Sequence, residues 1–112
     1  MKFETRQYGE VTLIQVCNDT LDAGNVGEFK RDIAPLIQNR SKVVFDLKQV
    51  QFIDSSGLGA ILSCLRQLNG QHGDLKLSNM QKTVRVLFEL VRMDRIFDIV
   101  ETPEDAILAF QP

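Results

Sequence analysis

The chain has 112 residues, enough for one hydrophobic core and too few for two, so a single domain spanning residues 1–112 is expected. Its 13 basic and 15 acidic residues give a formal net charge of −2 without a dense run of lysine or arginine, which argues against nucleic acid as a partner. Neither a secretory signal nor an apolar run of about 18 residues is found, so we expect a cytoplasmic protein that does not bind a membrane.

The first half of the chain is predicted to form a hairpin, a polar loop and a helix. Residues 3–8 and 11–17 are two strands joined by the turn Gly9-Glu10, and residues 18–25 are rich in turn formers. Apolar residues then recur at helical spacing from Val26 to Ile37, with Asn25 as a plausible cap. Pro35 lies inside this run and should kink the helix or end it early.

The second half alternates strands with helices. Residues 43–47 form a short apolar run typical of a buried strand, and a helix with an apolar face follows from Leu58 to Leu68, with a stop at Asn69-Gly70. A strand is predicted at residues 74–78, and a helix from residues 78–81 onward, with one apolar face formed by Val84, Leu87, Phe88 and Val91. A strand at 97–100 and a last helix capped by Thr102 follow. The alternation predicts helical crossovers, and with the opening hairpin it gives a mixed sheet.

Residues 54–59, Asp-Ser-Ser-Gly-Leu-Gly, form the junction between a strand and the helix that follows. Asp54 or Ser55 can cap the first free N–H groups, and Gly57 and Gly59 leave room for another group to approach the backbone. A helix N-terminus also stabilises an anion, so a phosphate on Ser55 would be well placed. The alternative is that these residues form only a cap and a tight packing contact.

This hexapeptide resembles the signature of the STAS domain, as found in anti-sigma factor antagonists of bacterial partner-switching systems. The resemblance extends over the predicted strand, loop and helix from Val43 to Leu68, and the flanking elements follow in the family's order. It implies an α/β fold, the STAS fold, in which a small mixed β-sheet is covered mainly on one side by about four helices.

The resemblance also implies which residues act. Ser55 matches the family's phosphorylated serine, with Ser56 as a secondary candidate, and Leu21-Asp22 matches a Leu-Asp pair that lies beside it. Asp19 stands where the family often has glycine, which either alters partner choice or only changes the turn. Asp19 and Asp22 could equally be solvated loop carboxylates. The expected partner-binding set is Leu21, Asp22, Asp54, Ser55, Ser56, Gly57, Leu58 and Gly59.

By the same resemblance, the expected function is that of an anti-sigma factor antagonist in a partner-switching pathway. The unphosphorylated form would bind an anti-sigma factor with serine kinase activity, phosphorylation on Ser55 would release that partner, and a metal-dependent serine phosphatase would restore binding. The alternative is a STAS module of a transporter or lipid-trafficking assembly that is not phosphorylated and holds a small anion or a partner.

No catalytic set is evident, so we expect neither an enzyme nor a cofactor. A nucleophile elbow needs glycine two residues before the serine, and neither Ser55 nor Ser56 has one. A hydrolase would need a base, and His72, the only histidine, lies in a predicted turn. Cys17 and Cys64 lack metal-ligand spacing, which predicts two small core residues and no metal site.

Overall fold

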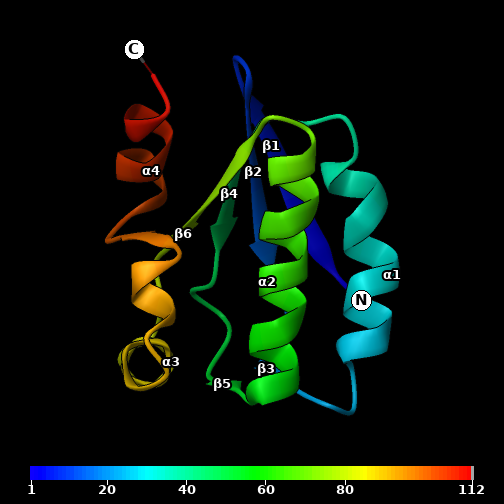
Figure 1. The fold of residues 1–112 in the computed structure, drawn as a ribbon, viewed down its shortest axis with the longest axis vertical. Coiled ribbons are helices and arrows are strands. Elements are labelled where there is room, and N and C mark those ends of the chain that lie inside the picture. Colours follow the sequence, from blue (N-terminus) through cyan, green and yellow to red (C-terminus); the bar gives the residue numbers. More distant parts are fainter. Residues whose placement is uncertain (112) are drawn as a thin grey trace.

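The computed structural model describes residues 1–111 and has a five-stranded sheet at its centre (Figure 1). The strand order is β1-β2-β4-β6-β7. The first pair, β1 and β2, is antiparallel, and the other three neighbouring pairs are parallel, so the predicted mixed sheet is confirmed. The strands of this sheet are β1 (Phe3–Tyr8), β2 (Val11–Val16), β4 (Lys42–Asp46), β6 (Asp74–Ser78) and β7 (Asp98–Val100).

Two further strands form a small separate sheet that the sequence analysis missed. The strand β3 (Thr20–Leu21) pairs in parallel with β5 (Phe52–Ile53), with Thr20 opposite Phe52 and Leu21 opposite Ile53. The predicted polar loop before the first helix is therefore attached to the segment before the second helix.

Helices cover both faces of the main sheet unequally. The first face carries α1 and α2, with α3 beside α2, while α4 packs on the other face against β2, β4, β6 and β7 (Figure 1). Covering mainly on one side is thus confirmed. The helices are α1 (Val26–Ile37), α2 (Ser55–Gly70), α3 (Lys82–Leu90) and α4 (Pro103–Ala109), and a 3-10 turn, η1 (Met93–Arg95), follows α3.

The core follows the alternation of side chains along the strands. In β4, Val43 and Phe45 face the large cluster under α1 and α2, whereas Val44 faces the small cluster under α4. Lys76 of β6 lies on the α4 face, where its ammonium contacts Asp98 at 2.8 Å and the ring of Phe110 at 4.7 Å. The charge of Lys76, 9% exposed, is therefore paired rather than isolated.

Several boundary predictions need correction. The side chain of Asn25 does not cap α1; it accepts from the N–H of Asp22 and donates to the carbonyl of Thr20, which holds the preceding loop together. Pro35 does not end α1 early: two helical residues follow it, and the N–H of Gln38 still donates to the carbonyl of Ala34. The third helix begins at Lys82, after Gln81, a few residues later than expected.

Candidate functional site

The predicted site lies at the N-terminal end of α2, where two loops meet. One loop follows β3 and contains Asp22 and Ala23, and the other is the turn from β5 into α2. The backbone joins them: the N–H of Gln51 donates to the carbonyl of Asp19 at 2.7 Å, and the N–H of Asp54 donates to the carbonyl of Leu21 at 3.3 Å. The structure thus brings the Leu21-Asp22 pair beside Ser55, although Asp22 and Ser55 are 33 positions apart in the sequence.

Asp54 is the side chain that connects these two loops. One carboxylate oxygen accepts from the N–H of Gly57 at 2.9 Å, which caps α2, and the other accepts from the N–H of Ala23 at 3.0 Å. The hydrogen bond from Gly57, and next that from Ala23, holds the pKa of the Asp54 carboxyl below its usual range. Asp54 is therefore charged at neutral pH, and its carboxylate holds the start of α2 and the loop after β3 together.

Gly57 allows the helix to press against the β3 loop. A methyl group at this position would overlap the carbonyl oxygen of Leu21 and approach the side chain of Ile53 at 2.9 Å. Gly59 differs, because nothing lies within 4 Å of the position that its β-carbon would take. The two glycines of the motif thus have different roles: Gly57 is required by close packing, and Gly59 leaves an open surface.

Ser55 is exposed as the first residue of α2, and Ser56 is half-buried next to it. A hydroxyl at this position is open to another protein and lies at the helix N-terminus, where a negative charge is stabilised. Asp54 and Asp22 are the neighbouring carboxylates; Asp22 accepts from the N–H of Gly24 at 2.9 Å. Asp19 is exposed. The site is therefore an open, mainly acidic surface that contains the exposed Ser55 and the half-buried Ser56.

Two members of the predicted partner-binding set have buried side chains. Leu21 is 0% exposed and Leu58 is 6% exposed, and both belong to the large core cluster. These residues shape the site through their backbone and through the packing beneath it. The surface available to a partner is formed by Ser55 and Gly59, with part of Asp22, Asp54 and Ser56.

The arrangement does not assemble a serine hydrolase. His72 is exposed in the turn after α2, whereas Ser55 and Ser56 begin that helix. The helix has 16 residues, so the two ends are about 24 Å apart at about 1.5 Å per residue. Cys64 is buried, and burial raises the pKa of its thiol to about 12, which makes it an unreactive core residue as predicted.

Within residues 1–111, no group of three or more His, Cys, Asp or Glu side chains is placed to hold a metal ion. None of the helices in that part of the chain is long and apolar enough to cross a bilayer.

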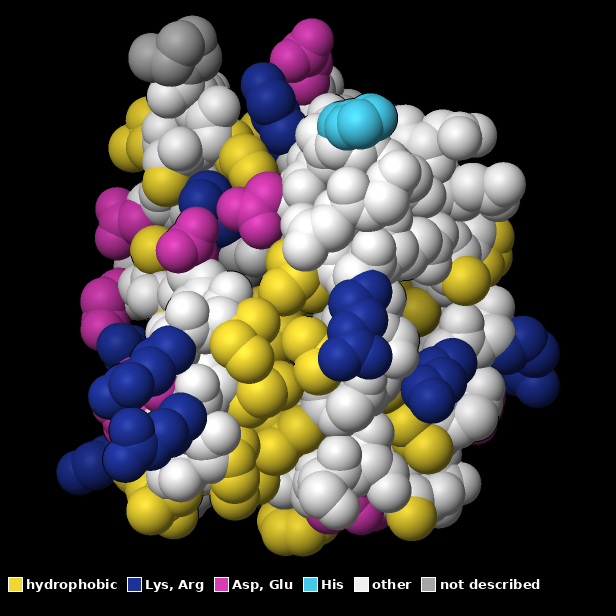
Figure 2. All heavy atoms as spheres, viewed as in Figure 1, with side chains coloured by type: hydrophobic (Ala, Val, Ile, Leu, Met, Phe, Trp, Pro, Cys, Tyr) yellow, Lys and Arg dark blue, Asp and Glu magenta, His cyan; other side chains and the backbone are white. Residues whose placement is uncertain are grey.

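Sequence reasoning missed one part of this region, an apolar strip of surface along the boundary between α2 and α3, with basic side chains on either side (Figure 2). The signal was present in part: Phe52 is an apolar residue directly before the motif, and Val86 and Leu90 lie outside the predicted apolar face of α3. The prediction of Val91 on the buried face was wrong, because Val91 follows the end of α3 and is 50% exposed.

Comparison with known proteins supports the family resemblance. The sequence model described as the STAS domain matches residues 2–106. BtrV of Bordetella bronchiseptica, described as a candidate anti-sigma factor antagonist, is 28% identical over 88% of this chain and 86% of its own length. The anti-sigma-B factor antagonist of Bacillus subtilis is 26% identical over 78% of this chain and 80% of its own length.

A solved structure supports the fold. The crystal structure of an anti-sigma factor antagonist from Mycobacterium paratuberculosis superimposes with a TM-score of 0.86, covering 99% of this chain and 94% of that one, at 20% identity. At this identity the likeness concerns the fold alone.

Proposed function

The chain belongs to the STAS domain family, and from this premise we propose that it is an anti-sigma factor antagonist regulated on Ser55. Its unmodified form binds an anti-sigma factor that is also a serine kinase, and phosphorylation of Ser55 releases that partner. A metal-dependent serine phosphatase returns the protein to its binding form. The protein itself acts by binding and not by catalysis.

The observation that carries the proposal is the exposed Ser55 hydroxyl at the start of α2, on a turn held in place by Asp54. A kinase must reach the acceptor oxygen, and an exposed first-turn serine meets that requirement. Because the two loops are cross-linked through backbone and carboxylate hydrogen bonds, a partner meets the same surface each time it binds. Such a surface loses little conformational entropy on association.

Phosphorylation acts in opposite directions on the domain and on the complex. Within the domain, the phosphate adds about −1.5 to −2 charge at a helix N-terminus, where negative charge is favourable. In the complex, the same charge would be buried against the partner beside Asp54 and Asp22, and its loss of hydration would not be offset. The switch therefore needs no change of fold.

The direct test is phosphorylation by the serine kinases encoded in the same genome. We expect ATP and the cognate kinase to add one phosphate to the protein, as measured by intact mass, and Ser55→Ala to abolish the gain. Ser56→Ala is the matched control and should still be phosphorylated. A gain that survives Ser55→Ala, or no gain with any of these kinases, would contradict the proposal and favour a STAS module that works without modification.

A second measurement tests release of the partner. Ser55→Glu should weaken binding of the kinase at least tenfold, about 1.4 kcal/mol, when measured by titration calorimetry with the full-length proteins. Ser55→Ala should bind within a factor of about three of the parent. Equal affinity of the Glu and Ala variants would show that negative charge at this position does not control the complex.

A further inference from the structure

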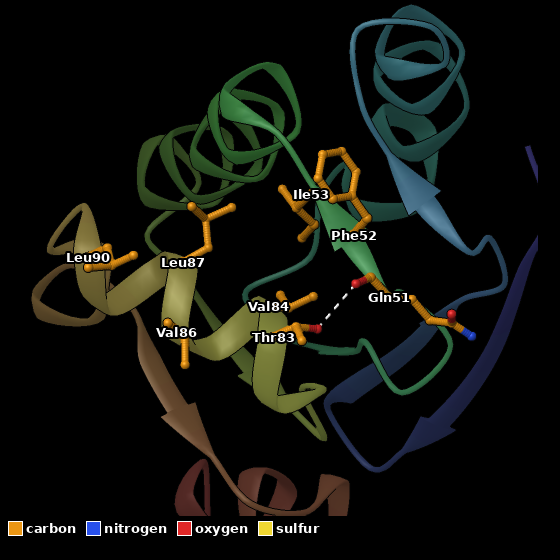
Figure 3. Close-up of a pocket in the computed structure, with 8 residues that line it drawn as sticks. All are labelled: Gln51, Phe52, Ile53, Thr83, Val84, Val86, Leu87 and Leu90. Atoms are coloured by element: carbon orange, nitrogen blue, oxygen red, sulfur yellow. Dashed lines mark hydrogen bonds between the residues drawn. The ribbon is translucent and has the colours of Figure 1, made fainter.

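An apolar groove lies beside the Ser55 turn, between β5 and α3 (Figure 3). It has a volume of about 250 Å³. Figure 3 shows Ile53, Val84 and Leu87 pointing into the space between the two elements, and the hydroxyl of Thr83 donating to the carbonyl of Gln51 at 3.3 Å. This hydrogen bond joins the first turn of α3 to the residue that precedes β5, at one end of the groove.

Large apolar side chains remain uncovered around this groove. Leu90 at the end of α3 is 75% exposed, and Phe52 of β5 is 54% exposed. Val86 within α3 and Val91 directly after it are also exposed. Thr83, Leu87 and Leu90 recur at helical spacing, so they form a stripe of about two turns along the groove. Scattered apolar residues are normal on a surface, but a lined groove with several of them together marks an interaction site.

Basic side chains flank the apolar strip in Figure 2, and the segment that contains α3 is basic although the chain as a whole is acidic. Residues 82–96 contain four basic side chains, Lys82, Arg85, Arg92 and Arg95, and only two acidic ones, Glu89 and Asp94. Arg85 pairs with Glu101 at 3.2 Å. Among residues 1–111, no carboxylate lies within ion-pair distance of Lys82, Arg92 or Arg95. This segment therefore carries a charge of +2 in a chain of −2, and it favours an acidic partner.

The groove is too small to form a whole protein–protein interface. It also lies so close to Ser55 that one partner would cover both. Eight residues line it, whereas a stable interface uses about 20 to 30 residues on each side. Phe52 is three residues before Ser55, so the two α-carbons are at most about 11 Å apart. A partner of ordinary footprint that covers Ser55 also covers the groove.

The groove favours a helix over an added strand. The strand β5 has only two residues, and the carbonyl of Gln51 next to it already accepts from Thr83, so little free backbone is left for strand pairing. A helix, by contrast, can insert apolar side chains at i, i+3 or i+4, and i+7 along a stripe of two turns.

We propose that this groove binds an amphipathic helix of the same anti-sigma factor kinase, with apolar side chains in the groove and acidic side chains against Lys82, Arg92 and Arg95. The proposal rests on the function proposed above. The Ser55 turn then controls release, and the groove provides an anchor that does not depend on phosphorylation.

The first test uses the full-length kinase that phosphorylates Ser55. Leu90→Ser and Val86→Ser each remove an exposed apolar side chain, and together they should weaken kinase binding at least tenfold in titration calorimetry. Leu108→Ser is the matched control, because Leu108 is 62% exposed on α4, on the opposite face of the sheet, and it should change affinity less than twofold. Equal effects of the groove and α4 variants, or no effect of either, would overturn the proposal.

The basic segment, residues 82–96, is tested with a matched pair of variants of its own. Reversal at Lys82 and Arg95 to Glu should weaken binding at least tenfold at low salt, and less at high salt. Lys30→Glu on α1, also exposed, should leave binding within twofold. An unchanged affinity after this charge reversal would contradict the proposal, because the partner's contacting surface would then not be acidic.

A synthetic peptide tests the groove even if no kinase modifies Ser55. A helical peptide of leucine and glutamate should shift the amide resonances of Phe52, Val86 and Leu90, and its leucine-lysine counterpart should bind at least tenfold more weakly. Equal binding of both peptides, or shifts elsewhere, would contradict the proposal.

A second copy of the chain is the other possible occupant of the groove, and sedimentation tests for it. A dimer that Leu90→Ser dissociates would contradict the proposal, because a second copy would then occupy the groove. If no kinase phosphorylates Ser55, the proposed function of Ser55 is refuted. Selective binding of the acidic peptide to the groove would still be valid.

Discussion

At the residue scale, Gly57 and Gly59 should respond in opposite ways to the same substitution. Gly57→Ala places a methyl group against the carbonyl of Leu21 and the side chain of Ile53, so it should lower the free energy of unfolding by about 1–3 kcal/mol. Gly59→Ala meets no atom within 4 Å and replaces glycine inside a helix, so it should raise that free energy by up to about 1 kcal/mol. Urea denaturation of the two variants measures both.

The pair of glycine variants controls for helix propensity, since both substitutions lie in the first turns of α2. If Gly57→Ala stabilises the protein as Gly59→Ala does, then the contact between α2 and the β3 loop is not tight. The shape of the Ser55 surface would in that case be less fixed than we describe.

Asp54 should make stability depend on pH in the acid range. The hydrogen bonds from Gly57 and Ala23 lower its pKa in the folded protein, so the folded state favours the charged form more than the unfolded state does. Its contribution is complete above the unfolded pKa of about 3.9 and is lost as pH falls through the lower folded pKa. The urea midpoint of the parent should therefore drop between pH 5 and pH 3.

Asp54→Asn is the control for this pH dependence. Asparagine keeps an acceptor for the cap but has no titrating carboxyl, so its urea midpoint should vary less over the same range. A carboxyl pKa for Asp54 at or above the ordinary value, measured by NMR, would contradict the expected direction.

At the scale of elements, the sequence predicted the long strands and helices well, because their apolar residues recur at clear spacings. The five strands of the main sheet and all four helices lie within a few residues of their predicted places. The strands β3 and β5 were missed because each has two residues, which is too short to show an alternation. Their pairing joins segments about 30 residues apart, and no local pattern contains that information.

The candidate site was predictable only in its local part. The motif at residues 54–59 indicated a capped helix start, and Asp54 does cap α2 through Gly57. The second bond of Asp54, to the N–H of Ala23, depends on β3 meeting β5 and was not predicted. The burial of Leu21 likewise follows from the fold and not from the motif.

Pro35 lies inside α1 and should lower the stability of that helix, which a substitution can test. Pro35 lacks the N–H that would bond the carbonyl of Arg31, and a proline in a helix interior costs about 3 kcal/mol relative to alanine. The cost is reduced near a helix end, and proline also restricts the unfolded chain by about 0.4–1 kcal/mol. Pro35→Ala should therefore stabilise the protein by about 1–2 kcal/mol.

Pro103→Ala is the matched control for Pro35→Ala. Pro103 is the first residue of α4, where its fixed φ suits the helix and its missing N–H would have no helical partner. Replacing it should lower stability by about 0.4–1 kcal/mol. Thermal or urea unfolding of both variants gives the comparison, and a destabilised Pro35→Ala would show that α1 depends on the rigidity of that proline.

At the scale of the whole molecule, the Ser55 turn and the groove lie at one end of a sheet whose two faces are covered by helices. The placement of α3 next to β5 creates the groove, and it depends on the crossover that follows β6. Sequence reasoning assigned α3 one apolar face, yet the helix has both a buried face, with Val84 and Phe88, and a second apolar edge that borders the groove. Only the assembled layers reveal that edge.

The last prediction concerns how the whole domain responds to charge on Ser55. Glutamate at the first position of α2 interacts favourably with the helix dipole by about 0.3–1 kcal/mol, and repulsion from Asp54 offsets part of this. Ser55→Glu should therefore be no less stable than the parent in urea. Its amide spectrum should differ from that of Ser55→Ala only at the start of α2 and at Leu21 to Gly24, because Asp54 is hydrogen-bonded to Leu21 and Ala23 and Asp22 to Gly24. Shifts that spread to α4, on the far face of the sheet, would show that charge on Ser55 changes the fold, and release of a partner would then require a conformational mechanism.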